Sequence, residues 1–428
     1  MARKVFISFL GTNNYVETIY EFPDKSKSDP VRFIQEALIL HDCKDWTEND
    51  KIYIFCTEGA EKANWLNNGQ KTEIEIEKIG LGQRLKDKFG LYSIVEMITI
   101  DEGFSTDEVW KIFDVVYDKL EKDDEVYFDV THAFRSIPLF SSVLFDYSKF
   151  MKSTNVVSIQ YGAFEKLGPA FEVRKKPIDS RIAPILDLTN ITKLQQYTDM
   201  ANSLLTYGRV KELSAMLKKE KTQALQKIGL SLEKFDGYLR TNRLTDIKEG
   251  KWLNVIMSNM EVLKKSNIPT PIKNIMYRLE DEFASFVPEC SAQNIESAVL
   301  WTSKYDMILQ SYTLGQEYMI SLLYEKLSDS NFYEKDKVKN YRMYISALFG
   351  ISEKDVETES FEGKLLDNID LTKKLLEVDW VKKIRPLYGK FSDYRNIVNH
   401  AKGTQNYSDI KNTFLKNYND CVNLIKSC

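Results

Sequence analysis

The spacing of apolar residues changes once along this chain, and that change constrains the fold more than any other feature of the sequence. Up to about residue 175, short apolar runs alternate with helically spaced patterns. The runs cover 4–10, 51–56, 93–100, 125–130 and 155–161, and the helical patterns cover 30–40, 106–120 and 137–151. Strands alternating with helices predict an α/β fold with a doubly wound, mostly parallel sheet.

From about residue 185 the strand patterns stop and long helical patterns follow, so we expect an all-α second half. These patterns cover 191–205, 210–227, 251–264, 272–286, 305–327, 337–348 and 371–385. A chain of 428 residues is too long for one ordinary core. We therefore expect an α/β domain over 1–180, a connecting helical segment over 181–215 and a helical domain over 216–428.

Charge and cysteine usage exclude several classes of protein. The formal net charge is −4, with 59 basic and 63 acidic residues, so any nucleic-acid site must be a local basic patch. No apolar run approaches the roughly 18 residues that a membrane span needs, and the N-terminal apolar run is too short for a signal peptide. The five cysteines are scattered without a CxxC pair, which argues against a disulfide framework or a zinc ribbon and favours a cytoplasmic location.

Three loops follow predicted strands of the α/β half, and ligands bind parallel sheets at that edge. They are Gly11–Tyr15, Thr57–Gly59 and Thr131–Arg135. The third has two interpretations: a strand-to-helix turn capped by polar side chains, or an anion site made by His132, Arg135 and a helix N-terminus. In the first loop, Gly11 permits close backbone approach, and Thr12 and Asn13 offer neutral donors. The sequence has neither GxGxxG nor GxxxxGK[ST], so a dinucleotide site is poorly supported and a P-loop NTPase is excluded.

Near the C-terminus, Arg395 precedes His400 by five residues. One interpretation is simply a helix end capped by Gly403. The other is a site for phosphodiester cleavage, because a histidine exchanges protons near neutral pH and an arginine supplies a permanent cation. The surroundings favour the second, since they are basic and carry aromatic side chains that could stack on bases or belong to the core. The basic residues include Lys382, Lys383, Lys390 and Lys402, and the aromatic ones are Trp380, Tyr388 and Tyr394.

Both ends of the chain resemble known families. The Met1–Tyr20 stretch, with its Val-Phe-Ile-Ser-Phe-Leu-Gly-Thr-Asn-Asn-Tyr run, looks like a CARF domain when taken together with Asp129-Val-Thr-His-Ala-Phe-Arg-Ser136. CARF domains are Rossmann-like sensors of cyclic oligoadenylate. The Arg395–His400 stretch in an all-α region looks like the HEPN ribonuclease motif. The pair in this order resembles the CARF–HEPN ancillary ribonucleases of type III CRISPR systems.

This resemblance implies an activity and its residues. It implies a homodimer that cyclic oligoadenylate activates to cleave single-stranded RNA without a metal or other cofactor, with a cyclic tetra-adenylate favoured and a cyclic hexa-adenylate as the alternative. Arg395, Asn396 and His400 would be catalytic, and the four lysines above would bind RNA. The residues implied to bind the activator are Gly11, Thr12, Asn13, Thr57, Thr131, His132 and Arg135.

The sequence leaves three other possibilities open. The chain could be a HEPN ribonuclease toxin controlled by a partner, with the α/β half serving only for dimerisation. It could be a CARF-type regulator without catalysis, although the helical half offers no convincing basic recognition helix. The sensor domain could also cleave its own ligand slowly. In the favoured interpretation, the protein acts without stable association with the CRISPR effector complex.

Overall fold

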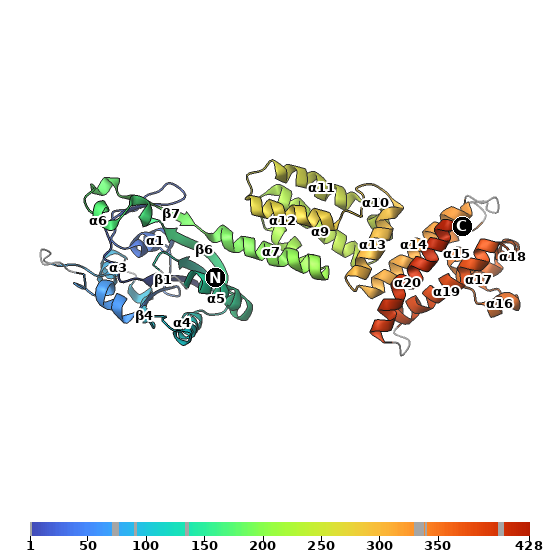
Figure 1. Cartoon of the computed structure of the whole chain (residues 1–428), viewed down its shortest axis with the longest axis horizontal. Coiled ribbons are helices and arrows are strands. Elements are labelled where there is room, and N and C mark those ends of the chain that lie inside the picture. Colours follow the sequence, from blue (N-terminus) through green and yellow to red (C-terminus); the bar gives the residue numbers. More distant parts are fainter. Residues whose placement is uncertain are drawn as a thin grey trace. The chain divides into compact units, whose positions relative to one another are not determined.

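The computed structural model divides the chain into two compact units, Met1–Gln195 and Gln196–Cys428 (Figure 1). The residues it describes are 2–70, 77–89, 92–132, 137–328, 338, 340–400 and 406–428. Arg135 and Lys402, both singled out from the sequence, lie outside them. The two units are defined by packing, and the functional domain limits expected from the sequence (1–180, 181–215 and 216–428) remain predictions.

Within the described residues, unit 1 holds a seven-stranded sheet in the order β2-β7-β6-β5-β1-β3-β4. Neighbouring strands run parallel except β6 and β7, which are antiparallel. The predicted mostly parallel sheet is therefore confirmed. The strands are β1 (Lys4–Leu10), β2 (Ile19–Glu21), β3 (Lys51–Cys56), β4 (Val95–Thr99), β5 (Glu125–Asp129), β6 (Asn155–Gly162) and β7 (Ile182–Asp187).

Helices cover both faces of this sheet because its central strands are apolar on both sides. In β1, Phe6 and Leu10 pack into the core on one face, while Ile7 and Phe9 pack into the core on the other. The first core also takes side chains from α1 (Ile34–Asp42) and α3 (Leu81–Phe89), and the second from α4 (Thr106–Asp118) and α5 (Ile137–Lys152). The sheet is therefore doubly wound, as the sequence predicts.

Two strands, β2 and β7, are absent from the sequence prediction. The first has only three residues, which is too short for a recognisable alternation. The second contains Pro184, and a proline within an apolar run argues against a strand because it cannot donate a backbone hydrogen bond. Together they extend the sheet beyond β6.

Among the described residues of unit 2, all regular secondary structure is helical, and the helices share one continuous hydrophobic core. Helix α7 (Thr189–Tyr207) begins in unit 1. The others are α8 (Lys211–Lys218), α9 (Gln223–Arg240), α10 (Leu244–Glu249), α11 (Lys251–Lys264), α12 (Thr270–Glu282), α13 (Ala292–Lys304), α14 (Ile308–Ser328), α15 (Tyr341–Gly350), α16 (Glu353–Glu357), α17 (Gly363–Leu366), α18 (Ile369–Leu376), α19 (Asp379–Asn399) and α20 (Tyr407–Ser427).

The all-α second half is confirmed, but several helix limits differ from prediction. The pattern over 371–385 covers two helices, α18 and α19, because the apolar spacing of Leu375, Val378 and Val381 continues across the break between them. The pattern over 210–227 likewise covers α8 and the start of α9. In this half, the helices that no pattern predicted are α10, α13, α16, α17 and α20. Among the described residues, no helix combines the length and the apolar character needed to cross a bilayer.

Candidate functional site

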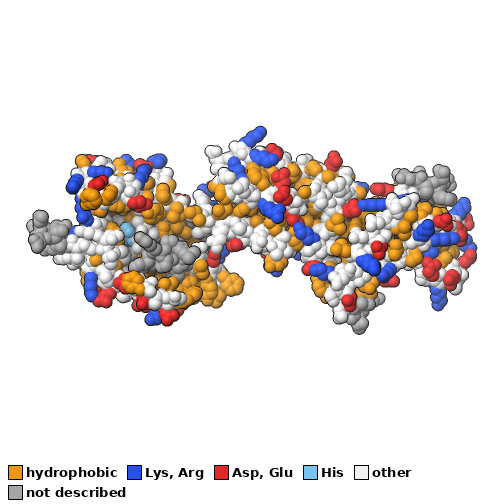
Figure 2. Space-filling model, in the orientation of Figure 1, with side chains coloured by type: hydrophobic (Ala, Val, Ile, Leu, Met, Phe, Trp, Pro, Cys, Tyr) orange, Lys and Arg blue, Asp and Glu red, His pale blue; other side chains and the backbone are white. Residues whose placement is uncertain are grey.

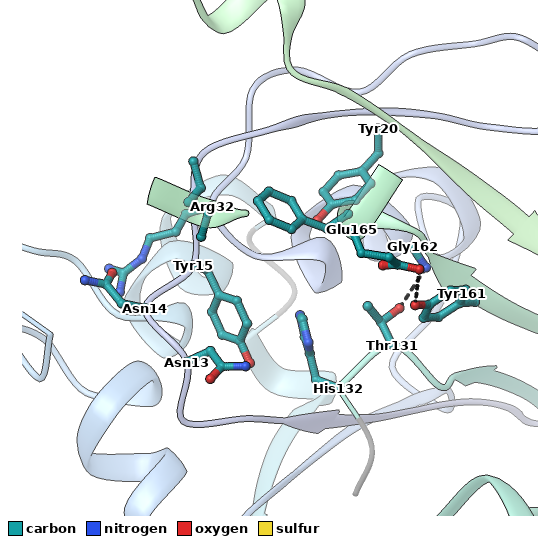
Figure 3. A pocket seen from close by; sticks show the side chains of 13 residues that line it. Asn13, Asn14, Tyr15, Tyr20, Arg32, Thr131, His132, Tyr161, Gly162 and Glu165 are labelled. Carbon is teal, nitrogen blue, oxygen red and sulfur yellow. Dashed lines mark hydrogen bonds between the residues drawn. The ribbon is translucent and has the colours of Figure 1, made fainter. Parts of the chain in front are cut away.

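A cavity of ≈350 Å³ lies at the carboxyl ends of β1, β5 and β6 (Figure 3). This is the sheet edge at which the sequence places a ligand site. Three of the predicted ligand residues, Asn13, Thr131 and His132, line it. The remaining lining residues are Asn14, Tyr15, Val16, Tyr20, Arg32, Tyr161, Gly162, Phe164, Glu165 and Ala170.

The loop after β1 is held in place by hydrogen bonds to its backbone. The Asn64 amide donates to the carbonyl oxygens of Gly11 (2.8 Å) and Asn13 (2.9 Å), and the Gly11 N–H donates to the Tyr15 hydroxyl (3.0 Å). Asn64 is buried and accepts a bond from Arg32 (3.1 Å). The loop therefore presents Asn13 and Tyr15 to the cavity from a fixed backbone.

The loop after β5 is ordered by the buried carboxylate of Asp129. Its two oxygens accept from the Ser8 hydroxyl (2.7 Å) and the Thr131 N–H (2.9 Å). Burial raises the pKa of Asp129, and these hydrogen bonds oppose that rise. The Thr131 hydroxyl in turn accepts from the Gly162 N–H (2.9 Å), which joins this loop to the end of β6 (Figure 3).

The cavity walls offer stacking surfaces and neutral polar groups. The rings of Tyr15 and His132 lie with centroids 4.3 Å apart. Burial lowers the pKa of His132 to about 4, so its ring is uncharged at neutral pH. Elsewhere on the wall, the Tyr161 hydroxyl donates to the Glu165 carboxylate (2.5 Å). Burial of the Tyr161 hydroxyl, together with the hydrogen bond to Glu165 and its negative charge, raises the pKa of Tyr161 to about 12. Such a lining suits a flat heteroaromatic ring with polar edges better than a bare anion.

Three predicted ligand residues do not line the cavity. The Thr57 side chain is buried and accepts from the Ala60 N–H, which caps the short helix α2 (Glu58–Ala60). Gly11 and Thr12 belong to the loop, but their backbone groups bond to Tyr15, Asn64 and Gln70.

Sequence reasoning missed Arg32, Tyr161 and Glu165, which lie in segments without a motif. Only Tyr161 had a signal: it ends a predicted strand, and parallel neighbours of that strand end at the same edge. Arg32 and Glu165 follow no such rule and reach the cavity through tertiary packing alone.

A second constellation lies at the C-terminal end of α19. His400 is exposed, and its backbone N–H donates to the Asn396 carbonyl (3.0 Å) where the helix ends. The Arg395 guanidinium donates from Nη1 to the Asn396 side-chain oxygen (3.1 Å). The three predicted catalytic residues thus occupy one helix end. Within the described residues, Arg395 Nε is buried and has no hydrogen-bond partner.

Asn399 adds a group that the predicted set omits. Its amide donates to the hydroxyl of Thr313 in α14 (3.4 Å), while its buried oxygen has no partner in the described part of the chain. Asn399 and Arg395 are four residues apart and share a helix face. Within the described residues, an acceptor and a donor without hydrogen-bond partners therefore lie on the same face of α19.

The predicted RNA-binding lysines lie at different distances from this helix end. At 1.5 Å per residue, Lys382 and Lys383 lie roughly 25 Å from His400 along α19, and Lys390 roughly 15 Å. All three are exposed, and Lys382 pairs with Glu377 (2.7 Å).

The nearby aromatic residues belong to the core. Tyr388 is fully buried, so its interpretation as a base-stacking residue is wrong. Trp380 and Tyr394 are partly buried against the core, and Trp380 also stacks on Phe349. In the ranges that the structure describes, no three His, Cys, Asp or Glu side chains are grouped as a metal site would need.

Comparisons with known proteins connect the chain to CRISPR-associated proteins. Residues 193–289 match a family model described as the second domain of CRISPR-associated protein MJ1674. CRISPR-associated protein MJ1674 of Methanocaldococcus jannaschii is 28% identical over 153 residues, which are 35% of this chain. The matched stretch spans only 22% of that relative's length.

A solved structure shares the fold over the whole chain. It is Enterococcus italicus Csm6 bound to cyclic hexa-2'-fluoro-hexa-dAMP, which matches 100% of this chain and 93% of its own with a TM-score of 0.50 and 10% sequence identity. At that identity the likeness is one of fold. It agrees with the predicted order of an α/β unit followed by a helical unit.

Proposed function

We infer that this chain, whose similarities support a CARF–HEPN ancillary protein of type III CRISPR systems, is a ribonuclease that cyclic oligoadenylate activates. One observation carries the inference: a cavity with a fixed, polar and partly aromatic lining lies at the sheet edge where the CARF-like motifs end. The structural neighbour, which holds a cyclic hexanucleotide analogue, supports the same ligand class.

In this proposal the cavity receives one adenine base of the activator. Tyr15 and His132 supply ring surfaces, and Asn13 and Thr131 supply donors and acceptors for the polar edge of the base. His132 acts as a neutral ring, because its pKa of about 4 leaves it uncharged at neutral pH. Arg135, predicted from the sequence to bind phosphate, remains part of the proposal. The ligand activates the enzyme if it binds the active arrangement more tightly than the resting one.

The proposed chemistry takes place at the end of α19. The 2'-hydroxyl oxygen of one nucleotide attacks the adjacent phosphorus, and the bond from phosphorus to the 5'-oxygen breaks. The 2'-proton leaves to a base and the 5'-oxygen gains a proton, which gives a 2',3'-cyclic phosphate and a 5'-hydroxyl end. His400 serves in these proton transfers, Arg395 stabilises the charge that builds on the phosphate, and Asn396 orients Arg395 through its side-chain oxygen.

We propose a homodimer in which two copies of Arg395 and His400 form one composite site. A two-fold ligand needs an interface in which the same surface meets itself. Helix α5 offers one: it follows the loop that carries His132 and exposes large apolar side chains on one face (Figure 2). These are Val143, Tyr147, Phe150 and Met151, and Phe150 is 85% exposed.

The proposal is tested with a panel of cyclic tri-, tetra- and hexa-adenylates and a fluorogenic RNA. We expect at least one ring to accelerate cleavage, and we expect that cleavage to persist in excess EDTA. Thr131→Val should weaken activation by that ring, because it removes the hydroxyl that bridges to Gly162 at the cavity. Ser258→Ala, an exposed hydroxyl in unit 2, is the matched control.

Each contrary result has a definite meaning. Equal cleavage with and without every ring would overturn the sensor assignment and favour a toxin controlled by a partner. Binding of a ring without any RNA cleavage would favour a regulator. Complete loss of activity in EDTA with rescue by a divalent ion would contradict the proposed chemistry.

A further inference from the structure

A basic groove lies beside the cavity of unit 1 and has no role in the proposal so far. Its volume is ≈470 Å³, and it shares Asn14, Tyr15, Val16 and Arg32 with the cavity lining. Two carboxylates, Glu17 and Glu77, face a larger number of basic side chains in it. The basic residues are Arg32, Lys78, Arg84, Arg174 and Arg181.

Two of these arginines are held by the backbone. The Arg174 guanidinium donates to the Asn14 carbonyl (2.6 Å). The Arg181 guanidinium donates to the carbonyls of Lys176 (2.7 Å), Arg174 (2.9 Å) and Glu17 (3.3 Å). Among the described residues, neither arginine forms an ion pair with a carboxylate. Their charges are therefore oriented but not neutralised.

This arrangement is suited to an anion. Arg84 is paired with the buried carboxylate of Glu36 (3.4 Å), whereas carbonyl groups restrict the guanidinium groups of Arg174 and Arg181 without cancelling their charge. An anion that enters the groove would therefore be attracted by these two charges. The planar guanidinium also matches the oxygens of a phosphate group. The bond from Arg174 to Asn14 ties the groove to the same loop that shapes the cavity, so one ligand can occupy both.

We propose that this groove binds phosphodiester groups of the oligoadenylate whose base enters the cavity. The inference rests on the proposed function and deepens it, since it divides the ligand between a partly aromatic cavity for a base and a basic groove for the backbone. A linear RNA strand carries the same phosphodiester chemistry, and the experiment separates the two sources.

The test measures binding of cyclic tetra-adenylate, cyclic hexa-adenylate and a linear oligoadenylate as a function of salt concentration. Arg174→Gln removes a charge from an exposed side chain while keeping a donor for Asn14. For the cyclic ligand that binds, we expect roughly tenfold weaker binding. The slope of log affinity against log salt should fall in magnitude by about 0.7, the value for one lost contact to a single-stranded phosphate.

Two further variants make the result decisive. Arg174→Lys keeps the charge and should keep the salt slope. Lys111→Gln removes an exposed charge beside Asp101, outside the groove, and should bind as the unaltered protein does. An unchanged slope in Arg174→Gln, or a slope that changes only for the linear strand, would overturn the groove assignment. Failure of the unaltered protein to bind any ring would instead overturn the proposed function.

Discussion

Arg395 and His400 occupy one helix end but differ in how the surrounding fold holds them. His400 is exposed and free to meet a substrate, whereas Arg395 is partly buried and bonded to Asn396. His400→Ala and Arg395→Ala should each lower RNA cleavage by at least about a hundredfold, the lower range for loss of a positioned acid–base or charge-stabilising group. Ligand binding and dimer formation should persist.

The matched control for this pair is Arg278→Ala, a surface arginine of α12 that pairs with Asp281. Its initial rate of fluorogenic RNA cleavage should equal that of the unaltered protein. Wild-type cleavage by the Arg395/His400 double variant would show that the HEPN-like motif has no catalytic part.

The buried ring of His132 leads to a separate prediction, which concerns the stability of the fold at acid pH. Its pKa in the fold is about 4, below the ordinary 6.5, so the unfolded chain binds a proton more readily than the folded one between these values. The contribution of His132 to the free energy of unfolding is therefore fully present above pH 6.5. It is lost as the pH falls toward 4, by roughly 3 kcal/mol at most. His132→Gln should flatten this part of the pH profile in chemical denaturation of the full chain. Parallel profiles for both proteins would show that His132 is not held neutral.

Among the elements, the loop after β1 depends on a close approach between Gly11 and Tyr15. A Cβ added at Gly11 would lie 2.7 Å from the Tyr15 hydroxyl oxygen, so that ring must move and its bond to the Gly11 N–H is strained. Because Tyr15 also lies against His132, we expect Gly11→Ala to weaken binding of the activator by several-fold, the equivalent of about 1 kcal/mol. Calorimetric titration of the variant and of the unaltered protein with the activating cyclic oligoadenylate measures this change in affinity.

Gly237 provides the contrasting glycine. It lies within α9, and a Cβ added there meets nothing within 4 Å. Gly237→Ala should leave ligand affinity unchanged and stabilise the helix by about 0.5–1 kcal/mol, because alanine loses less backbone entropy. Equal affinities for the Gly11 and Gly237 variants would mean that Tyr15 does not shape the ligand site.

Helix α14 contributes to the other site by placing α19. Gly315 in α14 leaves room for Phe391 of α19, whose ring would lie 3.0 Å from an added Cβ. Gln316 donates to the Tyr388 hydroxyl (3.1 Å), and Thr313 accepts from Asn399 (3.4 Å). The absence of a side chain at Gly315 and the two polar contacts thus hold α14 against α19, the helix that carries Arg395 and ends at His400.

At the scale of the whole molecule, the proposed activity requires two copies of the chain. Phe150→Asp puts a charge into the exposed apolar face of α5 and should shift the protein from dimer to monomer in sedimentation velocity, since a buried unpaired carboxylate is costly. Cleavage should fall with the dimer, because each chain contributes only one Arg395 and one His400.

Leu66→Asp is the control for this prediction. Leu66 is also exposed in unit 1, but it follows β3 and lies outside the face of α5. This variant should remain dimeric and active. A Phe150→Asp protein that stays dimeric would move the interface elsewhere, and an active monomer would refute the composite site.

The sequence was sufficient to predict that a half of alternating strands and helices precedes a helical half, and it placed both motifs along the chain. Apolar periodicity is a local property, so the strands over 4–10 and 51–56 and the helix over 251–264 match the structure at both ends. The loops after strands could be placed at one sheet edge by a topological rule. The proximity of Arg395 and His400 could also be predicted, because helix geometry places residues that are close in sequence near one another at a helix end.

Which side chains meet at the sheet edge depends on long-range packing, which no local pattern of the sequence encodes. Asn64 holds the loop at Gly11 from 53 residues away, and Arg174 reaches Asn14 across 160 residues. Such contacts depend on strand order and on the additional strands β2 and β7, which no local pattern encodes. For the same reason Thr57, which follows a strand as predicted, turned out to be a buried helix cap, while Tyr161 and Arg32 came to line the cavity.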